Sequence, residues 1–253
     1  MAYPTVIYGI DSQAYEIYSA AGNFGQSRYP IGTQLVVQDG RKWRFAMAGA
    51  STLVVGNVLT GVVPLATDVN MTPAAGAIGD RLITFTHGAA VTVANYFAEG
   101  YAVISVTPGG GDTYKILGHL ALASAAAGDI VNLAPGNALR RDLSGTSRLD
   151  LINHPYSRVI QAPVTTLAAV PVGVAVSAPT TLKYCFVQTR GVAGVLGSGT
   201  NIAGTRGVAG VAAGAIGPET AVAATSKLEV TIGTIVRAAA TAAWSSVFLT
   251  IDG

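Results

Sequence analysis

Three stretches of this chain share one pattern, in which an aromatic residue opens an alternating strand that runs through small residues into a corner of glycine and a polar residue. The stretches are WRFAMAGASTLVVGNVLTG at 43–61, YKILGHLALASAAAGDIVNLAPG at 114–136 and YCFVQTRGVAGVLGSGTNIAG at 184–204. Alternating apolar positions followed by Gly with Asn or Asp are typical of a half-buried strand that enters a tight turn. The pattern predicts a β-rich scaffold and carries no catalytic signature. Because the segments between the stretches differ, we do not interpret them as true repeats.

The clearest hairpin signal lies at Asp39 and Gly40, between the strand TQLVVQ and the strand RKWRF. On the outgoing strand, Trp43 and Phe45 share one face, because side chains alternate across a strand. We expect these two aromatic side chains to anchor the core of the first β unit.

Further strands are indicated by alternation in several other places. A second hairpin is expected around His87 and Gly88, between 81–85 and 89–93, and more strands at 101–106, 228–235 and 246–251. No stretch has a persuasive helical period. We therefore predict an all-β fold of mainly antiparallel strands, sandwich-like or barrel-like, with little helix and long Gly/Ala-rich loops.

The segment 137–158 is the most charged and least apolar part of the chain, and it predicts a boundary. The expected division is an extended N-terminal arm at 1–30, a first β domain at 31–158 and a second β domain at 159–253, the last two being either separate domains or one unit. At 253 residues the chain is long enough to bury a substantial core in either case.

The composition favours a protein whose surface is partly covered by partner proteins. Only 11% of the residues are charged and the net charge is +2, which leaves unusually little charge for a free soluble monomer. Because no long block of like charge occurs, we expect no direct binding of nucleic acid. No membrane association is expected either, since the longest uncharged run, 159–182, contains three prolines. The N-terminus shows no secretory signal.

No catalytic, cofactor-binding or metal-binding residue is predicted, and we expect the protein not to be an enzyme. The three histidines lie at least 32 residues apart and lack the spacing of metal ligands. The single cysteine, Cys185, lies in an apolar run, which favours a buried small side chain over a reactive thiol. The glycines of 191–197 resemble a dinucleotide-binding turn, but Gly199 would break the helix that such a turn requires.

Possible interface residues come from two places in the sequence. Residues 1–30 contain five of the ten tyrosines, and these side chains either pack on the protein's own core or form an arm on a neighbouring subunit. Lys42 and Arg44 share the outer face of their strand, where they are either solvated or in contact with an acidic surface or nucleic acid. The candidate interface residues are Tyr3, Tyr8, Tyr15, Tyr18, Lys42 and Arg44.

The order of several segments resembles the virion proteins of tailed bacteriophages that decorate or cement the head. The segments are YPIGTQLVVQDGRKWRFAMAGASTLVVGNVL, NYFAEGYAVI, PGGGDTYKILGH, AAGDIVNLAPGNAL, INHPYSRVIQAP and YCFVQTRGVAGVL, within residues 30–251. The resemblance implies a β-rich, non-enzymatic protein that binds the outer capsid surface, bridges neighbouring major capsid subunits and forms a homo-oligomer, a dimer or trimer. It would be made in the host cytoplasm and reside on the exterior of the virion.

Two other functions remain open from the sequence. A tail, baseplate or fibre component that binds host glycans would also be β-rich and glycine-rich. A polysaccharide-cleaving virion enzyme would require clustered carboxylates in a cleft, and the four glutamates are scattered along the chain.

Overall fold

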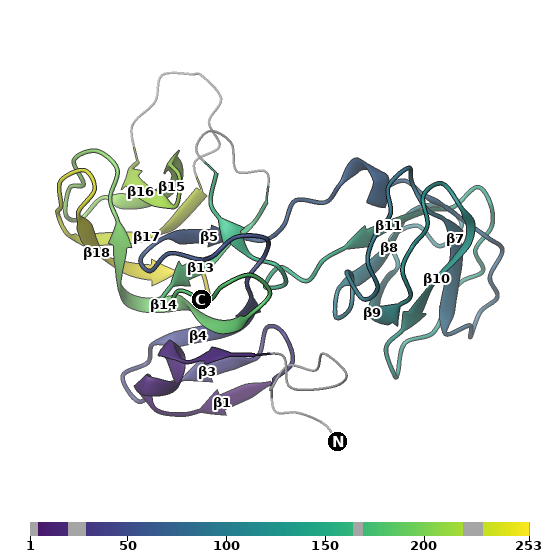
Figure 1. Ribbon diagram of the computed structural model, residues 1–253, viewed down its shortest axis with the longest axis horizontal. Helices are drawn as coiled ribbons and strands as arrows, with labels where there is room; N and C mark the ends of the chain where they lie inside the picture. The colour runs from purple at the N-terminus through teal and green to yellow at the C-terminus, as the bar shows by residue number, and fades with distance from the viewer. Residues whose placement is uncertain (1–4, 20–28, 164–168, 220–229, 253) are drawn as a thin grey trace. The chain divides into compact units, whose positions relative to one another are not determined.

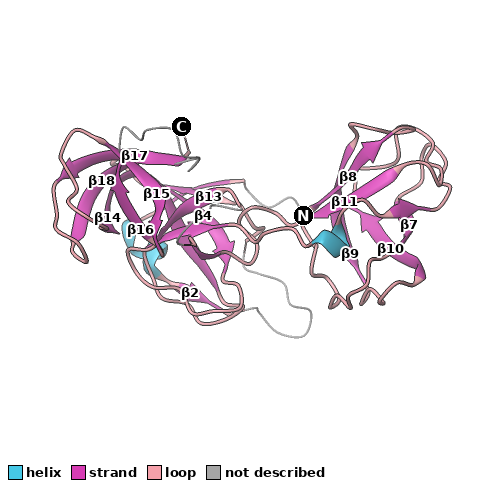
Figure 2. Ribbon diagram, turned by 90° about the horizontal axis from the view of Figure 1, so that it is seen from above, coloured by secondary structure: helices cyan, strands magenta, loops and turns pink. Residues whose placement is uncertain are grey.

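The computed structural model describes residues 5–19, 29–163, 169–219 and 230–252 (Figure 1). The chain is all-β, as predicted: strands and loops make up both parts of the molecule, and helix is confined to short 3₁₀ turns (Figure 2). The chain divides into two compact units, one formed by Met1–Val62 with Pro155–Gly253 and the other by Val63–His154. No helix in the described part of the chain has the length and hydrophobicity to span a bilayer.

The first unit is built on one large sheet with the path β1-β3-β4-β14-β18-β17-β15-β16, to which β2, β5, β12 and β13 add further pairings. Its elements are β1 (Val6–Tyr8), η1 (Asp11–Tyr15), β2 (Ile17–Tyr18), β3 (Gln34–Val36), β4 (Lys42–Met47), β5 (Val58–Thr60), β12 (Ile160–Gln161), β13 (Pro171–Ala175), β14 (Tyr184–Leu196), β15 (Arg206–Ala212), β16 (Ala215–Pro218), β17 (Val230–Arg237) and β18 (Trp244–Thr250).

The hairpin expected at Asp39 and Gly40 is confirmed as β3 and β4. Gly40 takes φ 84°, a left-handed conformation that costs glycine little, and the Asp39 carboxylate accepts a 3.0 Å hydrogen bond from the Arg41 N–H. Trp43 and Phe45 are both fully buried, as predicted. Each such aromatic side chain contributes about 1.5–3 kcal/mol relative to leaving it exposed.

Strand β14 connects the two halves of this sheet. Its first half pairs with β4, where Phe186 lies opposite Phe45, and its second half pairs with β18, where Val192 lies opposite Phe248. The change of partner coincides with Gly191, which takes φ 87°. One long strand can therefore bury its first half against the N-terminal strands and its second half against the C-terminal ones.

The second unit is a six-stranded antiparallel sheet with the order β11-β8-β9-β10-β7-β6. Its edges meet, since Met71 and Leu149 exchange backbone hydrogen bonds of 3.0 and 2.9 Å and Gly76 pairs with Leu143. The curled sheet is barrel-like, and large side chains such as Phe85, Phe97 and Tyr114 fill it. Its elements are η3 (Ala66–Asp68), β6 (Thr72–Pro73), β7 (Leu82–Thr86), β8 (Tyr101–Val106), β9 (Thr113–His119), β10 (Ala127–Leu133) and β11 (Arg148–Ile152).

The division of the chain differs from the expected one at 158. The charged segment 137–158 contributes β11 to the second unit, where it pairs with β8, and the unit ends at His154. The N-terminal strands belong with the C-terminal ones because β4 pairs with β14. The second unit is thus inserted between two parts of the first.

Two local expectations also differ from the structure. The second hairpin is wrong: β7 pairs with β10 and β6, whereas in 89–93 only Thr92 forms a bridge, to Leu122. Residues 5–19 of the N-terminal segment do not form an extended arm. They pack on their own unit, because β1 pairs with β3, β2 pairs with β14 and Ala14 is fully buried.

Candidate interaction surface

The N-terminal tyrosines have different environments. Tyr18 lies in an aromatic cluster, with ring centroids 5.6 Å from Phe45 and 6.1 Å from Phe186, so it serves the protein's own core. Tyr8 and Tyr15 are 84% and 48% exposed. Tyr3 lies outside the described residues. Of the described candidates on this segment, Tyr8 and Tyr15 are therefore accessible to a partner.

Strand register brings three of the candidate residues onto one face of β1, β3 and β4. Tyr8 lies opposite Val36, which lies opposite Lys42, and in the next row Gln34 lies opposite Arg44. The core side of these strands is occupied by Leu35 and Trp43, so Tyr8, Lys42 and Arg44 share the outer side.

Arg44 is not a free surface charge. Its guanidinium donates to both carboxylate oxygens of Asp252, at 2.7 and 2.9 Å, and its side chain is only 27% exposed. The hydrogen bond to Asp252 raises the pKa of Arg44 above its ordinary value. Of the two candidate residues on this strand, Arg44 therefore contacts an acidic side chain of its own unit, Asp252.

A second exposed area lies on the outer face of β14, β17 and β18. We call it the β18 patch and define it by four side chains that are 42–57% exposed: Val192, Val236, Trp244 and Phe248. Val192 and Phe248 are directly opposite each other on paired strands. Trp244 lies over Gly56, where a Cβ atom would come within 3 Å of the indole ring. The patch is therefore held by the sheet and by one turn packed beneath Trp244.

A hollow of about 430 Å³ borders this patch. It is lined by Val192 and Phe248 on the sheet side and by Asp39 and Arg41 of the β3–β4 turn. The Arg41 stem crosses Gly191 so closely that a Cβ atom there would lie 2.6 Å from the Arg41 Cγ. Arg41 forms ion pairs with Asp39 at 2.6 Å and Asp11 at 2.8 Å. The hollow thus joins apolar side chains to a group of charges.

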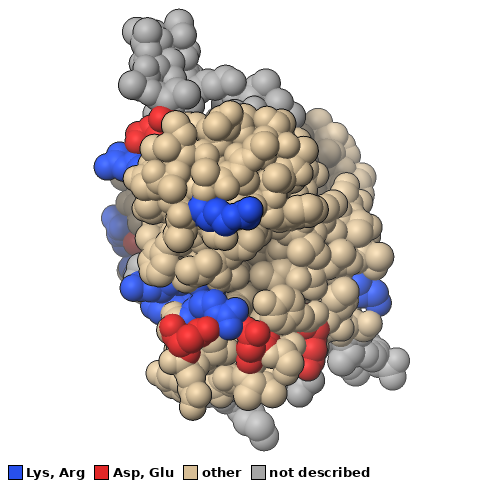
Figure 3. Space-filling view, turned by 90° about the vertical axis from the view of Figure 1, so that its left-hand side faces the viewer, with Lys and Arg blue, Asp and Glu red and all other residues tan. Residues whose placement is uncertain are grey.

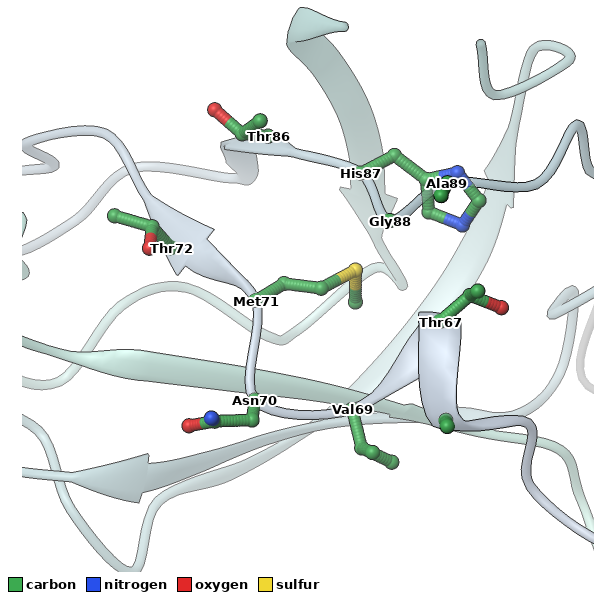
Figure 4. Close-up of a pocket in the computed structure, with 10 residues that line it drawn as sticks. Thr67, Val69, Asn70, Met71, Thr72, Thr86, His87, Gly88 and Ala89 are labelled. Atoms are coloured by element: carbon green, nitrogen blue, oxygen red, sulfur yellow. The ribbon is translucent and has the colours of Figure 1, made fainter. Parts of the chain in front are cut away.

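In the second unit, a hollow of about 370 Å³ lies beside His87 (Figure 4). Figure 4 shows the segment from Thr67 to Thr72 on one side of it and His87 to Ala89 on the other. His87 Nε2 is 3.1 Å from the Asp68 carboxylate and Nδ1 is 3.3 Å from the Ala123 carbonyl oxygen. Both ring nitrogens therefore lie within hydrogen-bonding distance of an oxygen of the same unit. Neither nitrogen is available as a general base.

His119, the other buried histidine of this unit, is held as a neutral ring. Its Nε2 accepts the Phe97 N–H at 3.0 Å, and its Nδ1 donates to the Leu120 carbonyl oxygen at 2.6 Å. Burial lowers the pKa of His119 below its ordinary value. The two buried histidines therefore both have structural roles.

Cys185 is buried, as predicted, and burial raises the pKa of its thiol to about 12. The thiol is therefore unreactive at neutral pH. Within the described residues, no group of three or more His, Cys, Asp or Glu side chains is placed to hold a metal ion.

Comparisons with known proteins give no relative: no protein-family model, curated protein or solved structure matches this chain significantly.

The β18 patch was not predicted from the sequence. Its signal is present in the strand WSSVFLT, where Val247 and Leu249 are buried and Trp244 and Phe248, on the opposite face, are also large and apolar. A strand that is apolar on both faces indicates either double burial or a contact surface.

Proposed function

We propose that the protein is a non-enzymatic structural component of a tailed-phage virion, which binds the exterior of the head and bridges neighbouring major capsid subunits. The observation that supports this role is the contrast between its polar and apolar groups. In the described residues the buried histidines and carboxylates are engaged in internal bonds, whereas large apolar side chains stand exposed on both units, among them Tyr8, Trp244 and Leu120. Such a chain is suited to surface contact.

The physical task of a decoration protein fits these features. A shell under pressure from packaged DNA is stabilised by added contacts across its subunit boundaries, and many small contacts on one particle act together. Low charge suits this role, because few ions have to be desolvated at each contact. Figure 3 shows one side of the molecule as largely uncharged.

The decisive test is the location and copy number of the protein in purified particles. We expect hundreds of copies spread over the head, as seen by labelled electron microscopy and quantitative mass spectrometry, and earlier DNA release on heating of particles that lack the protein. A few copies at the tail would contradict the proposal and favour a tail component. Absence from particles would overturn any virion role.

The contact residues are tested separately by point variants. Deleting 1–30 would also remove Ala14 and Tyr18 from the core, so loss of binding after deletion would have two explanations. Tyr8→Ser and Lys42→Ser change the outer face of β1, β3 and β4 and leave the core intact. We expect reduced incorporation for these variants and normal incorporation for Ile78→Ser, an exposed apolar position of the second unit.

A further inference from the structure

We propose that His119 is an acid-sensitive switch in the second unit: when its ring takes up a proton, the turn at 95–99 opens and Phe97 leaves the core. The contact that the proton breaks is the hydrogen bond from the Phe97 N–H to the His119 ring. This inference goes beyond the proposed function, because it does not depend on the protein being part of a virion.

The hydrogen-bond partners of His119 determine which ring nitrogen carries its proton. A backbone N–H can only donate, so the 3.0 Å bond from Phe97 requires that His119 Nε2 is unprotonated. A carbonyl oxygen can only accept, so the 2.6 Å bond to Leu120 requires a proton on Nδ1. A second proton could bind only at Nε2, where it would point at the Phe97 N–H. Protonation of the ring and the bond from Phe97 therefore exclude each other.

A β-bulge turns His119 into the core of the second unit. On β10, the buried Val131 and Leu133 are two residues apart, whereas their partners on β9, His119 and Ile116, are three residues apart. The additional residue on β9 lets both partners face inward, which regular alternation would not allow. His119 is only 4% exposed as a result, so a positive charge on the closed ring would be poorly solvated.

The turn at 95–99 has an unfavourable backbone conformation at both of its ends. Asn95 and Glu99 have φ values of 58° and 62°, in the left-handed region that is costly for residues other than glycine. Between them, Phe97 is 1% exposed, and its ring centroid lies 5.6 Å from that of His119. Loss of the bond from the Phe97 N–H therefore releases the middle of a turn that is already strained.

Several ionisable groups lie on the elements around His119. Besides tyrosines, these elements carry Asp68, His87, Glu99, Lys115 and Asp129. Burial has the largest effect on the pKa of His119 and lowers it, and the hydrogen bond to Leu120 opposes this shift. His87 lowers the pKa further and Asp129 raises it, and the overall pKa lies below the ordinary value. Because an exposed ring takes up a proton at about pH 6.5, the closed turn loses stability as the pH falls from there to the pKa of the buried ring.

Opening of the turn enlarges an apolar area on the second unit. Val93 and Leu120, which lie beside the turn in the sequence and next to His119, are already 60% and 84% exposed. Phe97 adds an aromatic ring to these side chains once it has left the core. The second unit thus presents a larger apolar contact surface in acid than at neutral pH.

The switch is tested on the full chain by NMR titration of the histidine rings and by hydrogen exchange. We expect the ring of His119 to titrate below about pH 6.5. The opening constant of the Phe97 amide, corrected for the intrinsic exchange rate, should rise by up to tenfold for each pH unit below that value, because opening takes up one proton. Amides of β8 and β10 should keep their protection. A Phe97 amide that stays protected while His119 is protonated overturns the proposal, and so does a ring that stays neutral until the whole unit unfolds.

Matched substitutions separate His119 from the other histidines. In His119→Gln, the side-chain oxygen can accept the Phe97 N–H at any pH, so acid should no longer open the turn. His154→Gln, the same change at a half-buried histidine of the same unit, should keep the wild-type response. A His119→Gln variant that still opens in acid would assign the response to another group, such as His87, and overturn the proposal. The wild-type titration decides the question even if His119→Gln fails to fold, because it follows the ring and the Phe97 amide in one sample.

Discussion

Arg44 and Asp252 are joined by two hydrogen bonds, of 2.7 and 2.9 Å, although 208 residues separate them in the sequence. Gln34 donates a third bond to the same carboxylate at 3.0 Å. The C-terminal end of β18 is thereby fixed to the β3–β4 hairpin, so the first and last parts of the chain close one unit. The ion pair adds to the β4–β14 pairing that brings the N-terminal and C-terminal strands into one unit.

Removal of the Asp252 carboxylate should destabilise the first unit. Asp252→Ala leaves Arg44 partly buried without its partner, and hydrogen bonds to charged groups contribute about 1.5–3 kcal/mol each when well formed. Because both side chains remain partly exposed, we expect a loss of about 1–2 kcal/mol in the free energy of unfolding, measured by urea denaturation. Glu219→Ala, which removes an exposed pair, should change it by less than about 0.5 kcal/mol. Equal losses in the two variants would contradict this role of Asp252.

Acidification should weaken both units. Burial raises the pKa of Asp252, but the hydrogen bonds from Arg44 and Gln34 and the nearby positive charges outweigh it, and the pKa is lowered overall. In the second unit, the hydrogen bond from Arg141 lowers the pKa of Asp112. A carboxyl with a lowered folded-state pKa stabilises the protein above its unfolded pKa of about 3.9 and loses this contribution as the pH falls through the folded value.

The measurement is the urea midpoint between pH 6 and pH 2.5. We expect it to fall gradually below about pH 6.5, where the unfolded chain protonates His119 more readily than the folded chain does, and more steeply below about pH 4. Asp252→Asn should reduce the fall of the midpoint for the first unit, since residue 252 then has no carboxylate that can be protonated. Two results would show that these carboxylates do not govern acid stability. One is a wild-type midpoint that is unchanged at pH 2.5, and the other is an Asp252→Asn midpoint that depends on pH as the wild-type midpoint does.

His87→Leu should be among the most damaging changes in the second unit. The side chains of His87 and Asp68 are 0% and 2% exposed, so the variant leaves a buried carboxylate without its partner. Leaving a buried hydrogen-bonding group unsatisfied costs roughly 1–3 kcal/mol, and more where the group is charged. The double variant His87→Leu with Asp68→Leu should recover part of that loss, which thermal unfolding of the full chain would show. Val91→Ala, at a 72% exposed position, serves as the control.

Gly56→Ala should disturb the β18 patch, although Gly56 is not one of the residues that define the patch. Gly56 takes φ 82°, and a Cβ atom there would lie 2.4 Å from the indole nitrogen of Trp244. We expect a loss of about 1 kcal/mol from the backbone conformation, and a shift of the indole. Since Trp43 is fully buried and Trp244 is 57% exposed, acrylamide quenching reports on Trp244. Unchanged quenching relative to the wild type would mean that the indole does not rest on Gly56.

The recurring aromatic pattern has a tertiary explanation that the sequence did not contain. The stretches that begin at Trp43 and Tyr184 are neighbours in one sheet, where the Phe45 and Phe186 rings lie 5.1 Å apart. The stretch that begins at Tyr114 supplies a strand to the core of the other unit. Tyr114 is buried inside that curled sheet. The stretches are similar because each supplies a strand to a core, not because each forms a module.

What the sequence determined by itself was local: the all-β class, the hairpin at Asp39 and Gly40, the burial of Trp43 and Phe45, and the inert environment of Cys185. Alternation with period two and turn chemistry are properties of a few consecutive residues. They do not depend on which strands later pair. Which strands pair was decided only by the tertiary structure. The same alternating strand can match many partners, and closing β4 onto β14 spans more than a hundred residues that no local pattern records. The insertion of one unit into the other, the ion pair of Arg44 with Asp252 and the exposure of Phe248 all follow from that pairing.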